Sequence, residues 1–156
     1  MDRDLGKSLN WFLLLEINQV QLYKAQAHQV ADTHLREALN RFAQIEQEHV
    51  EKIATLLRQM GGDVGWLTAA CESSWGKQFA RLGMEGIMSA VDKIGEDKLL
   101  SIAILGEQRA IADYKKLIAK TPEPWVLEVL WANLIDEELH SGWMKNYLTG
   151  KQNISP

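Results

Sequence analysis

Apolar residues recur along most of this chain at intervals of three and four positions, the period of an amphipathic helix. The pattern predicts four long helices and no strand. The buried seams of these helices are predicted to carry Leu9, Phe12, Glu16, Val20, Tyr23, Ala27 and Val30; Leu39, Phe42, Glu46, His49, Ile53, Leu56 and Met60; Leu100, Ala103, Glu107, Ala110, Tyr114 and Leu117; and Val126, Leu130, Asn133, Glu137, His140, Met144 and Tyr147. A glutamate therefore interrupts every apolar seam near the middle of its helix.

Turn residues group the four helices into two hairpins. Asp32 and Thr33 are good helix N-caps and lie close to the midpoint between Glu16 and Glu46. Residues 121–124 read Thr-Pro-Glu-Pro, which predicts the end of one helix and the start of the next. Because residues equidistant from the turn of an antiparallel hairpin lie at the same height, each hairpin is expected to bring its two glutamates level.

A long connection, residues 62–95, separates the two hairpins and is too long for a turn. Its own apolar positions, among them Trp66 and Trp75, predict a crossover that contains one or two helical pieces. With such a crossover the first and third helices run parallel. The third helix is expected to begin near Glu96, and residues 151–156 are expected to form a frayed tail.

One four-residue signature occurs twice in the chain, with every member displaced by the same 91 positions. The two copies are Glu16, Tyr23, Glu46 and His49, and Glu107, Tyr114, Glu137 and His140. A single glutamate on a helix is most often a solvated surface residue. A repeated set of ionisable residues on buried seams instead favours a common role in the interior.

Charge balance suggests what that role is. Four carboxylates in a low-dielectric interior repel one another and lose hydration, whereas two divalent cations neutralise them. Imidazole from His49 and His140 would add one nitrogen ligand to each cation, a mixture that suits iron or manganese, and the lack of thiolates argues against a zinc cluster. Three residues rise about 4.5 Å along a helix, so the Glu of Glu-x-x-His can bridge two metals while the His binds one. The predicted ligands of two iron ions, with manganese as an alternative and without haem, are Glu16, Glu46, His49, Glu107, Glu137 and His140.

Two segments resemble a known family. Residues 45–53, which contain Glu-Gln-Glu-His, and residues 136–143, which contain Asp-Glu-Glu-Leu-His, resemble the second and fourth helices of bacterioferritin and rubrerythrin domains. These domains are di-iron carboxylate proteins of the ferritin-like superfamily. The resemblance covers both hairpins and leaves the crossover unmatched. It implies a ferritin-like antiparallel four-helix bundle with the long crossover between its second and third helices.

The resemblance also implies roles for individual residues. Glu46 and Glu137 match the bridging carboxylates of the family, and Glu16 and Glu107 match its terminal carboxylates. In such proteins a tyrosine two turns after the terminal glutamate hydrogen-bonds a ligand carboxylate. That role falls on the repeated tyrosines, Tyr23 and Tyr114, for which a purely packing role in the core is the alternative.

Asp136, directly before Glu137, is a further candidate for the site. Its carboxylate could accept the second N–H of a metal-bound imidazole and so fix the orientation of the ring. A solvated aspartate on the helix surface is the competing interpretation, and the sequence leaves both open.

Composition narrows the class of protein. With 156 residues and 46% apolar content, the chain is expected to form a single domain, 1–156, with a substantial core. A net charge of -4 argues against general affinity for nucleic acid or anionic lipid. A single cysteine, Cys71, and an N-terminus without a basic leader favour the cytoplasm. No apolar run approaches the roughly 20 residues of a membrane span.

The predicted function is therefore that of a non-haem di-iron oxidoreductase that reacts with O2 or peroxide and takes electrons from an external donor. The ferroxidase and rubrerythrin-like peroxidase types fit best. Two alternatives stay open: a di-iron hydroxylase of a small or lipid-like organic substrate, and a non-enzymatic iron-binding or stress-related partner protein. A homodimer is expected because the Trp- and Met-rich crossover offers more apolar surface than one bundle can cover.

Overall fold

The computed structural model describes residues 3–62, 64 and 95–154. Within these ranges the chain forms helices and no strand, in agreement with the predicted all-α class. The helices are α1 (Arg3–Gln29), α2 (Thr33–Gln59), α5 (Glu96–Ile118) and α6 (Pro124–Ile154). The helical pieces predicted for the crossover, and Cys71, lie outside the described residues.

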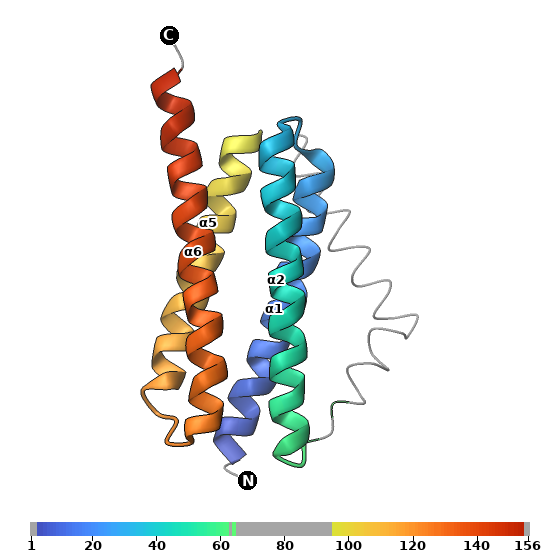
Figure 1. Cartoon of the computed structure of the whole chain (residues 1–156), viewed down its shortest axis with the longest axis vertical. Coiled ribbons are helices and arrows are strands. Elements are labelled where there is room, and N and C mark those ends of the chain that lie inside the picture. Colours follow the sequence, from blue (N-terminus) through green and yellow to red (C-terminus); the bar gives the residue numbers. More distant parts are fainter. Residues whose placement is uncertain (1–2, 63, 65–94, 155–156) are drawn as a thin grey trace. The chain divides into compact units, whose positions relative to one another are not determined.

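The chain divides into two compact units, Met1–Lys93 and Ile94–Pro156. In the first unit, α1 and α2 pack along each other as a helical hairpin (Figure 1). In the second unit, α5 and α6 do the same. Both predicted hairpins are therefore present, while the single domain expected over 1–156 stays a prediction.

Asp32 shapes the turn of the first hairpin, as its sequence position predicts. It is the N-cap of α2, and its side chain accepts a hydrogen bond of 2.8 Å from the backbone N–H of Leu35. The guanidinium of Arg36 donates a hydrogen bond of 2.9 Å to the carbonyl of Val30 at the other end of the turn. These two contacts satisfy backbone groups that a helix end leaves without intrahelical partners.

A glycine pair ends α2. Gly61 has a φ of 76°, a conformation that costs little only for a residue without a Cβ. The N–H of Gly62 donates to the carbonyl of Leu57 at 2.8 Å, and the N–H of Gly61 donates to the carbonyl of Arg58 at 2.9 Å. This is the Schellman arrangement, in which the last carbonyls of a helix find donors after the chain has turned away.

The second hairpin follows the predicted boundaries at its turn. α5 begins at Glu96, and Pro124 is the first residue of α6, a position where the missing N–H of proline costs nothing. At the end of α5, the hydroxyl of Thr121 donates a hydrogen bond of 2.8 Å to the carbonyl of Leu117. The Thr-Pro-Glu-Pro segment thus stops one helix and starts the next.

The predicted frayed tail is wrong for residues 151–154, because α6 continues to Ile154. Lys151 gives the reason. Its ammonium lies 2.5 Å from the carboxylate of Glu96 at the start of α5 and 5.3 Å from the centre of the Tyr147 ring. The hydrogen bond to Glu96 raises the pKa of Lys151 above its ordinary value of 10.5, although partial burial opposes the shift. This contact joins the last turns of α6 to the start of α5.

The predicted apolar seams are confirmed as the buried faces of the helices. Every predicted seam residue of α1 and α5 is buried, and in α2 and α6 only the last, Met60 and Tyr147, is half-buried. Burying one such leucine stabilises the fold by about 1.5–3 kcal/mol. The glutamates of these seams are thus held in place by the packing of the apolar residues above and below them. Within the described residues, no helix has the length and apolar character needed to cross a membrane.

Candidate metal site

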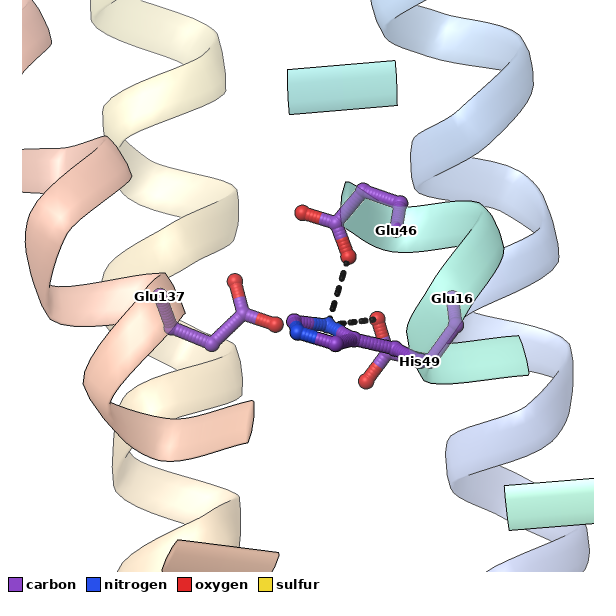
Figure 2. Close-up of side chains that lie close together, drawn as sticks. All are labelled: Glu16, Glu46, His49 and Glu137. Carbon is purple, nitrogen blue, oxygen red and sulfur yellow. Dashed lines mark hydrogen bonds and ion pairs between the residues drawn. The ribbon is translucent and has the colours of Figure 1, made fainter. Parts of the chain in front are cut away.

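Glu16 of α1 and Glu46 and His49 of α2 form a first cluster in the first unit. Each of the three side chains is 0% exposed. Nδ1 of His49 lies 3.1 Å from Oε2 of Glu46 and 3.6 Å from Oε2 of Glu16. Figure 2 shows the two carboxylates directed at the imidazole, with dashed lines for these two interactions. The three-residue spacing of Glu46 and His49 places both on the same face of α2, as the sequence predicts.

The equivalent residues of the second unit form a second cluster: Glu107 of α5 with Glu137 and His140 of α6. The two glutamates are 0% exposed and the histidine is 1% exposed. Nδ1 of His140 lies 3.6 Å from Oε1 of Glu107 and 4.0 Å from Oε2 of Glu137. The sequence repeat is thus also a structural repeat, since each hairpin brings its own two carboxylates and one imidazole together.

The spacing of the donor atoms fits a metal ion in each cluster. Within each cluster, one ligand atom from every residue lies within 4.8 Å of the ligand atoms of the other two. Ligands bound about 2.1 Å from a cation lie at most about 4.2 Å apart, so small side-chain movements would bring all three atoms into contact with one ion. Carboxylate oxygen and imidazole nitrogen without sulfur form a donor set that suits iron or manganese.

A hydrogen-bonded network without metal is the competing account of the same residues. Two ionised carboxylates and one imidazole buried together carry a net negative charge even when the imidazole is protonated. Taking such a charge out of water costs several kcal/mol unless it is compensated. In the second cluster the imidazole nitrogen lies 3.6 and 4.0 Å from the carboxylates, beyond ordinary hydrogen-bond length. A cation would compensate the charge and fits these separations, whereas the 3.1 Å contact of His49 with Glu46 in the first cluster is a hydrogen bond.

Both predicted tyrosines are buried, each about two helical turns after the glutamate of its own helix. Tyr23 is 1% exposed on α1, and its ring packs edge-on against Phe42 with centroids 5.6 Å apart. Tyr114 is 0% exposed on α5, and its hydroxyl accepts a hydrogen bond of 3.1 Å from the side chain of Asn133. Their predicted contact with a ligand carboxylate stays a prediction.

Asp136 is half-buried on α6, immediately before Glu137. Its proposed role in orienting a histidine ring also stays a prediction.

Sequence reasoning placed Asn133 on the buried seam of the fourth helix but gave it no role; it is 0% exposed on α6, one turn before Glu137. An asparagine among apolar seam positions was the available signal. Its partner Tyr114 is 19 positions away on the other helix, which no local pattern reveals.

A groove with a volume of about 560 Å³ lies on the first hairpin. Leu13, Ile17 and Val20 of α1 line it together with the stripe of α2 that contains Val50 and Ala54. The residues of the first cluster do not line this groove.

Comparison with known proteins identifies the fold. A solved two-domain protein from Anabaena variabilis, with DJ-1/ThiJ/PfpI-like and ferritin-like domains, aligns with 99% of this chain at a TM-score of 0.79 and 16% sequence identity. The fold is ferritin-like. The two hairpins are those of an all-α four-helix bundle, as the sequence predicted. Neither a protein-family model nor a curated protein matches the chain.

The likeness is one of fold and covers only 42% of the Anabaena protein. Together with the buried clusters of carboxylates and histidines, the ferritin-like fold is compatible with the binding of two metal ions. At 16% identity it does not distinguish a bacterioferritin-like from a rubrerythrin-like protein.

Proposed function

We propose that this chain is a ferritin-like di-iron oxidoreductase that reacts with O2 or peroxide, of ferroxidase or rubrerythrin-like peroxidase type. One observation carries the proposal. Two hairpins related by a 91-residue repeat each bury two carboxylates and one imidazole, with the ligand atoms within 4.8 Å of one another. A buried charge of this kind is costly, and its occurrence at equivalent positions of both hairpins favours a common ligand chemistry.

Each cluster would hold one metal ion. In the first, Glu16, Glu46 and His49 would be the ligands, and in the second the equivalent residues Glu107, Glu137 and His140. The family resemblance implies that Glu46 and Glu137 bridge the two ions. Three protein ligands from one hairpin leave coordination positions open, as catalytic metal sites require. Manganese is the alternative to iron for this donor set.

Glutamates, histidines and apolar residues would each contribute differently to the metal site. The glutamates neutralise the cations and keep them close together, while the histidines contribute neutral nitrogen ligands through Nδ1, the ring atom that faces the carboxylates in both clusters. The buried apolar seams keep bulk water away from the ligands, which strengthens the electrostatic attraction between carboxylate and cation. A bound iron pair would supply the two electrons that reduce O2 or peroxide.

Repeated turnover needs an external electron donor, whose identity the ligands do not specify. Because both clusters are buried, electrons would have to pass through the protein or enter by exchange of the iron itself. A ferroxidase takes its electrons from incoming Fe(II), whereas a peroxidase takes them from a reductant that stays outside. This difference separates the two types experimentally.

The rate of Fe(II) oxidation tests the proposal. Apoprotein loaded anaerobically with two Fe(II) per chain and then exposed to air is expected to consume Fe(II) much faster than buffer alone. The double variant Glu46→Gln and Glu137→Gln removes one carboxylate from each cluster and is expected to return the rate to that of buffer. Equal oxidation rates with and without wild-type protein would contradict the enzymatic proposal. The same measurement with peroxide in place of air separates a peroxidase from a ferroxidase.

The hydroxylase alternative requires an apolar cavity that reaches the metal ligands. The groove on the first hairpin has a volume of about 560 Å³, but Glu16, Glu46 and His49 do not line it. This groove therefore does not supply the cavity that a hydroxylase requires. The non-enzymatic alternative differs by its outcome, since it predicts metal binding without accelerated oxidation.

Homodimer formation and a cytoplasmic location also remain proposals. The apolar crossover on which the expected homodimer rested lies outside the described residues. α6 does expose Trp131, Ile135 and Leu139, three apolar residues that follow one another at intervals of four. Sedimentation equilibrium of the full chain would decide the oligomeric state.

A further inference from the structure

An apolar row runs along the exposed side of α6. Trp131, Ile135 and Leu139 follow one another at intervals of four and are 50%, 53% and 64% exposed. Leu127 and Trp143, both half-buried, extend the row by one step in each direction. Residues four apart are neighbours on the surface of a helix, so the row is continuous. Single exposed apolar residues are ordinary, whereas a continuous exposed patch of them is typical of an interaction surface.

The row points away from the proposed metal ligands of the same helix. Successive side chains of an α-helix are rotated by about 100°, so Ile135 and Glu137 point to nearly opposite sides of α6. Glu137 is accordingly 0% exposed, whereas Ile135 is 53% exposed. The row therefore takes no part in holding a cation, and its contribution has to come from contacts outside the hairpin.

The equivalent positions of the first hairpin are polar. The 91-residue offset that relates the two hairpins places three polar residues of α2 at the positions of the exposed row: Asn40, Gln44 and Glu48. All three are exposed as well. A solvated side chain is thus sufficient for the hairpin at these positions. The apolar row is specific to α6 and is not required by the repeated architecture.

A second copy of the same row matches its shape. When two copies of α6 pack antiparallel about a two-fold axis at Ile135, each tryptophan of the row meets a leucine of the other copy. Trp131 meets Leu139, Trp143 meets Leu127, and Ile135 meets its own copy. Rows at intervals of four are the ridges through which helices most often pack, and a two-fold contact is the commonest association of identical chains.

Charges near the two ends of the row favour the antiparallel arrangement. Glu128 and Lys145 are exposed, and neither forms an ion pair among the residues that the structure describes. In an antiparallel pair, Lys145 of one copy lies level with residue 125 of the other, about 4.5 Å along the helix from Glu128. A parallel pair would instead set Glu128 beside its own copy and align the two helix dipoles. Glu138, which also borders the row, is already paired with Lys115 of α5 at 2.7 Å.

We infer that this row is the surface through which two copies of the chain form a homodimer, with α6 of one copy antiparallel to α6 of the other. The inference rests on the proposed homodimer, to which it gives a defined contact, and it does not depend on metal binding. Three exposed apolar residues per chain make a small interface, so the dimer is expected to dissociate on dilution.

Sedimentation equilibrium of the full chain over a wide range of concentrations tests the inference. The wild type is expected to pass from monomer to dimer as its concentration rises. Ile135→Lys removes the central apolar contact and places two like charges at the two-fold axis, so it is expected to weaken association by about a hundredfold or more. Gln44→Lys introduces the same residue at the equivalent exposed position of α2 and is expected to leave association unchanged.

Exchanging the charges at the ends of the row tests the antiparallel orientation. Glu128→Lys and Lys145→Glu each create like charges across the contact, and each is expected to weaken association by up to about tenfold. The double variant brings opposite charges together again and is expected to restore association. Because the two residues are about 26 Å apart along one helix, they can compensate each other only between two copies.

Ile135→Cys in a Cys71→Ser background keeps the test open if Ile135→Lys does not fold, which its helix content shows. A disulfide requires the two Cα atoms to approach within about 7 Å. Rapid oxidation to a covalent dimer is therefore expected for Ile135→Cys and not for Gln44→Cys in the same background, and equal crosslinking of the two would contradict the inference.

Three sedimentation results would overturn the inference. A wild type that stays monomeric at every concentration would overturn the proposed homodimer as well. A dimer that Ile135→Lys leaves intact would assign the homodimer to another surface. A double charge variant that associates no better than either single variant would exclude the antiparallel contact. Mn(II) binding by Ile135→Lys is expected to match that of the wild type, so this inference and the proposed metal site fail separately.

Discussion

Replacing Glu46 by glutamine is expected to impair metal binding without disrupting the helical hairpin. The side chain of Glu46 is 0% exposed and lies 3.1 Å from His49, so Glu46→Gln removes a charge and a ligand oxygen while keeping the size of the side chain. Glu48 offers a matched control on the same helix, because it is exposed and outside both clusters. Glu48→Gln makes the same chemical change where no metal is proposed to bind.

Linkage between binding and folding gives the magnitude. A ligand present at 100 times its Kd stabilises the folded protein by about 2.7 kcal/mol per site, or about 5 kcal/mol for two sites. For a chain of this length each kcal/mol raises the melting temperature by about 2–4 °C. The wild type is thus expected to melt about 10–20 °C higher with metal than without. Glu46→Gln removes a ligand from the first cluster, and by the bridging role from the second as well, so the shift is expected to fall by half or more.

The apoprotein is expected to change in the opposite direction. Without metal, Glu16 and Glu46 are two carboxylates buried in one cluster, and removing one relieves their repulsion. Apo Glu46→Gln should therefore melt no lower than the apo wild type. Differential scanning calorimetry with and without Mn(II) measures both quantities. A full metal shift in Glu46→Gln, or an equal loss in Glu48→Gln, would refute the reasoning.

Three further predictions concern the fold around the clusters. Asp32→Ala removes the acceptor of the α2 cap and is expected to cost about 1 kcal/mol in urea unfolding, with an unchanged m-value. Gly61→Ala places a Cβ on a residue with a φ of 76° and is expected to lower the free energy of unfolding by about 1–2 kcal/mol. Gly106→Ala, at an exposed position within α5 where nothing lies within 4 Å of the added carbon, is expected to raise it by up to about 1 kcal/mol. The opposite order would contradict the role of Gly61 in ending α2. The raised pKa of Lys151 means that its stabilising contact with Glu96 is fully present below pH 10.5 and is lost as pH rises further; because the pair is partly exposed we expect only about 0.5–1 kcal/mol, and Lys151→Met should remove this loss above pH 10.5.

Local patterns were enough to predict the seams and the turns. The buried positions of α1 and α5 follow directly from the three- and four-residue spacing of apolar residues. The Asp32 cap and the Pro124 start were predicted because both act through backbone groups within a few residues of themselves. The sequence also predicted which residues cluster in each hairpin, because the position of the turn determines which residues of the two helices lie at the same level.

Contacts between distant side chains were not predictable in this way. The end of α6 was placed too early because the partner of Lys151 lies 55 positions away at the start of α5. Asn133 was assigned no role because its hydrogen bond reaches Tyr114 across the hairpin. In both cases the partner lies on the other helix of the hairpin, so only the packed hairpin shows the contact.

Anomalous diffraction from crystals of the full chain grown anaerobically with Fe(II) tests the central claim most directly. The account predicts two iron peaks about 3.5–4 Å apart, one beside Glu16, Glu46 and His49 and the other beside the second cluster. Iron found only at the protein surface, or the two clusters joined by hydrogen bonds with no iron between their side chains, would contradict it.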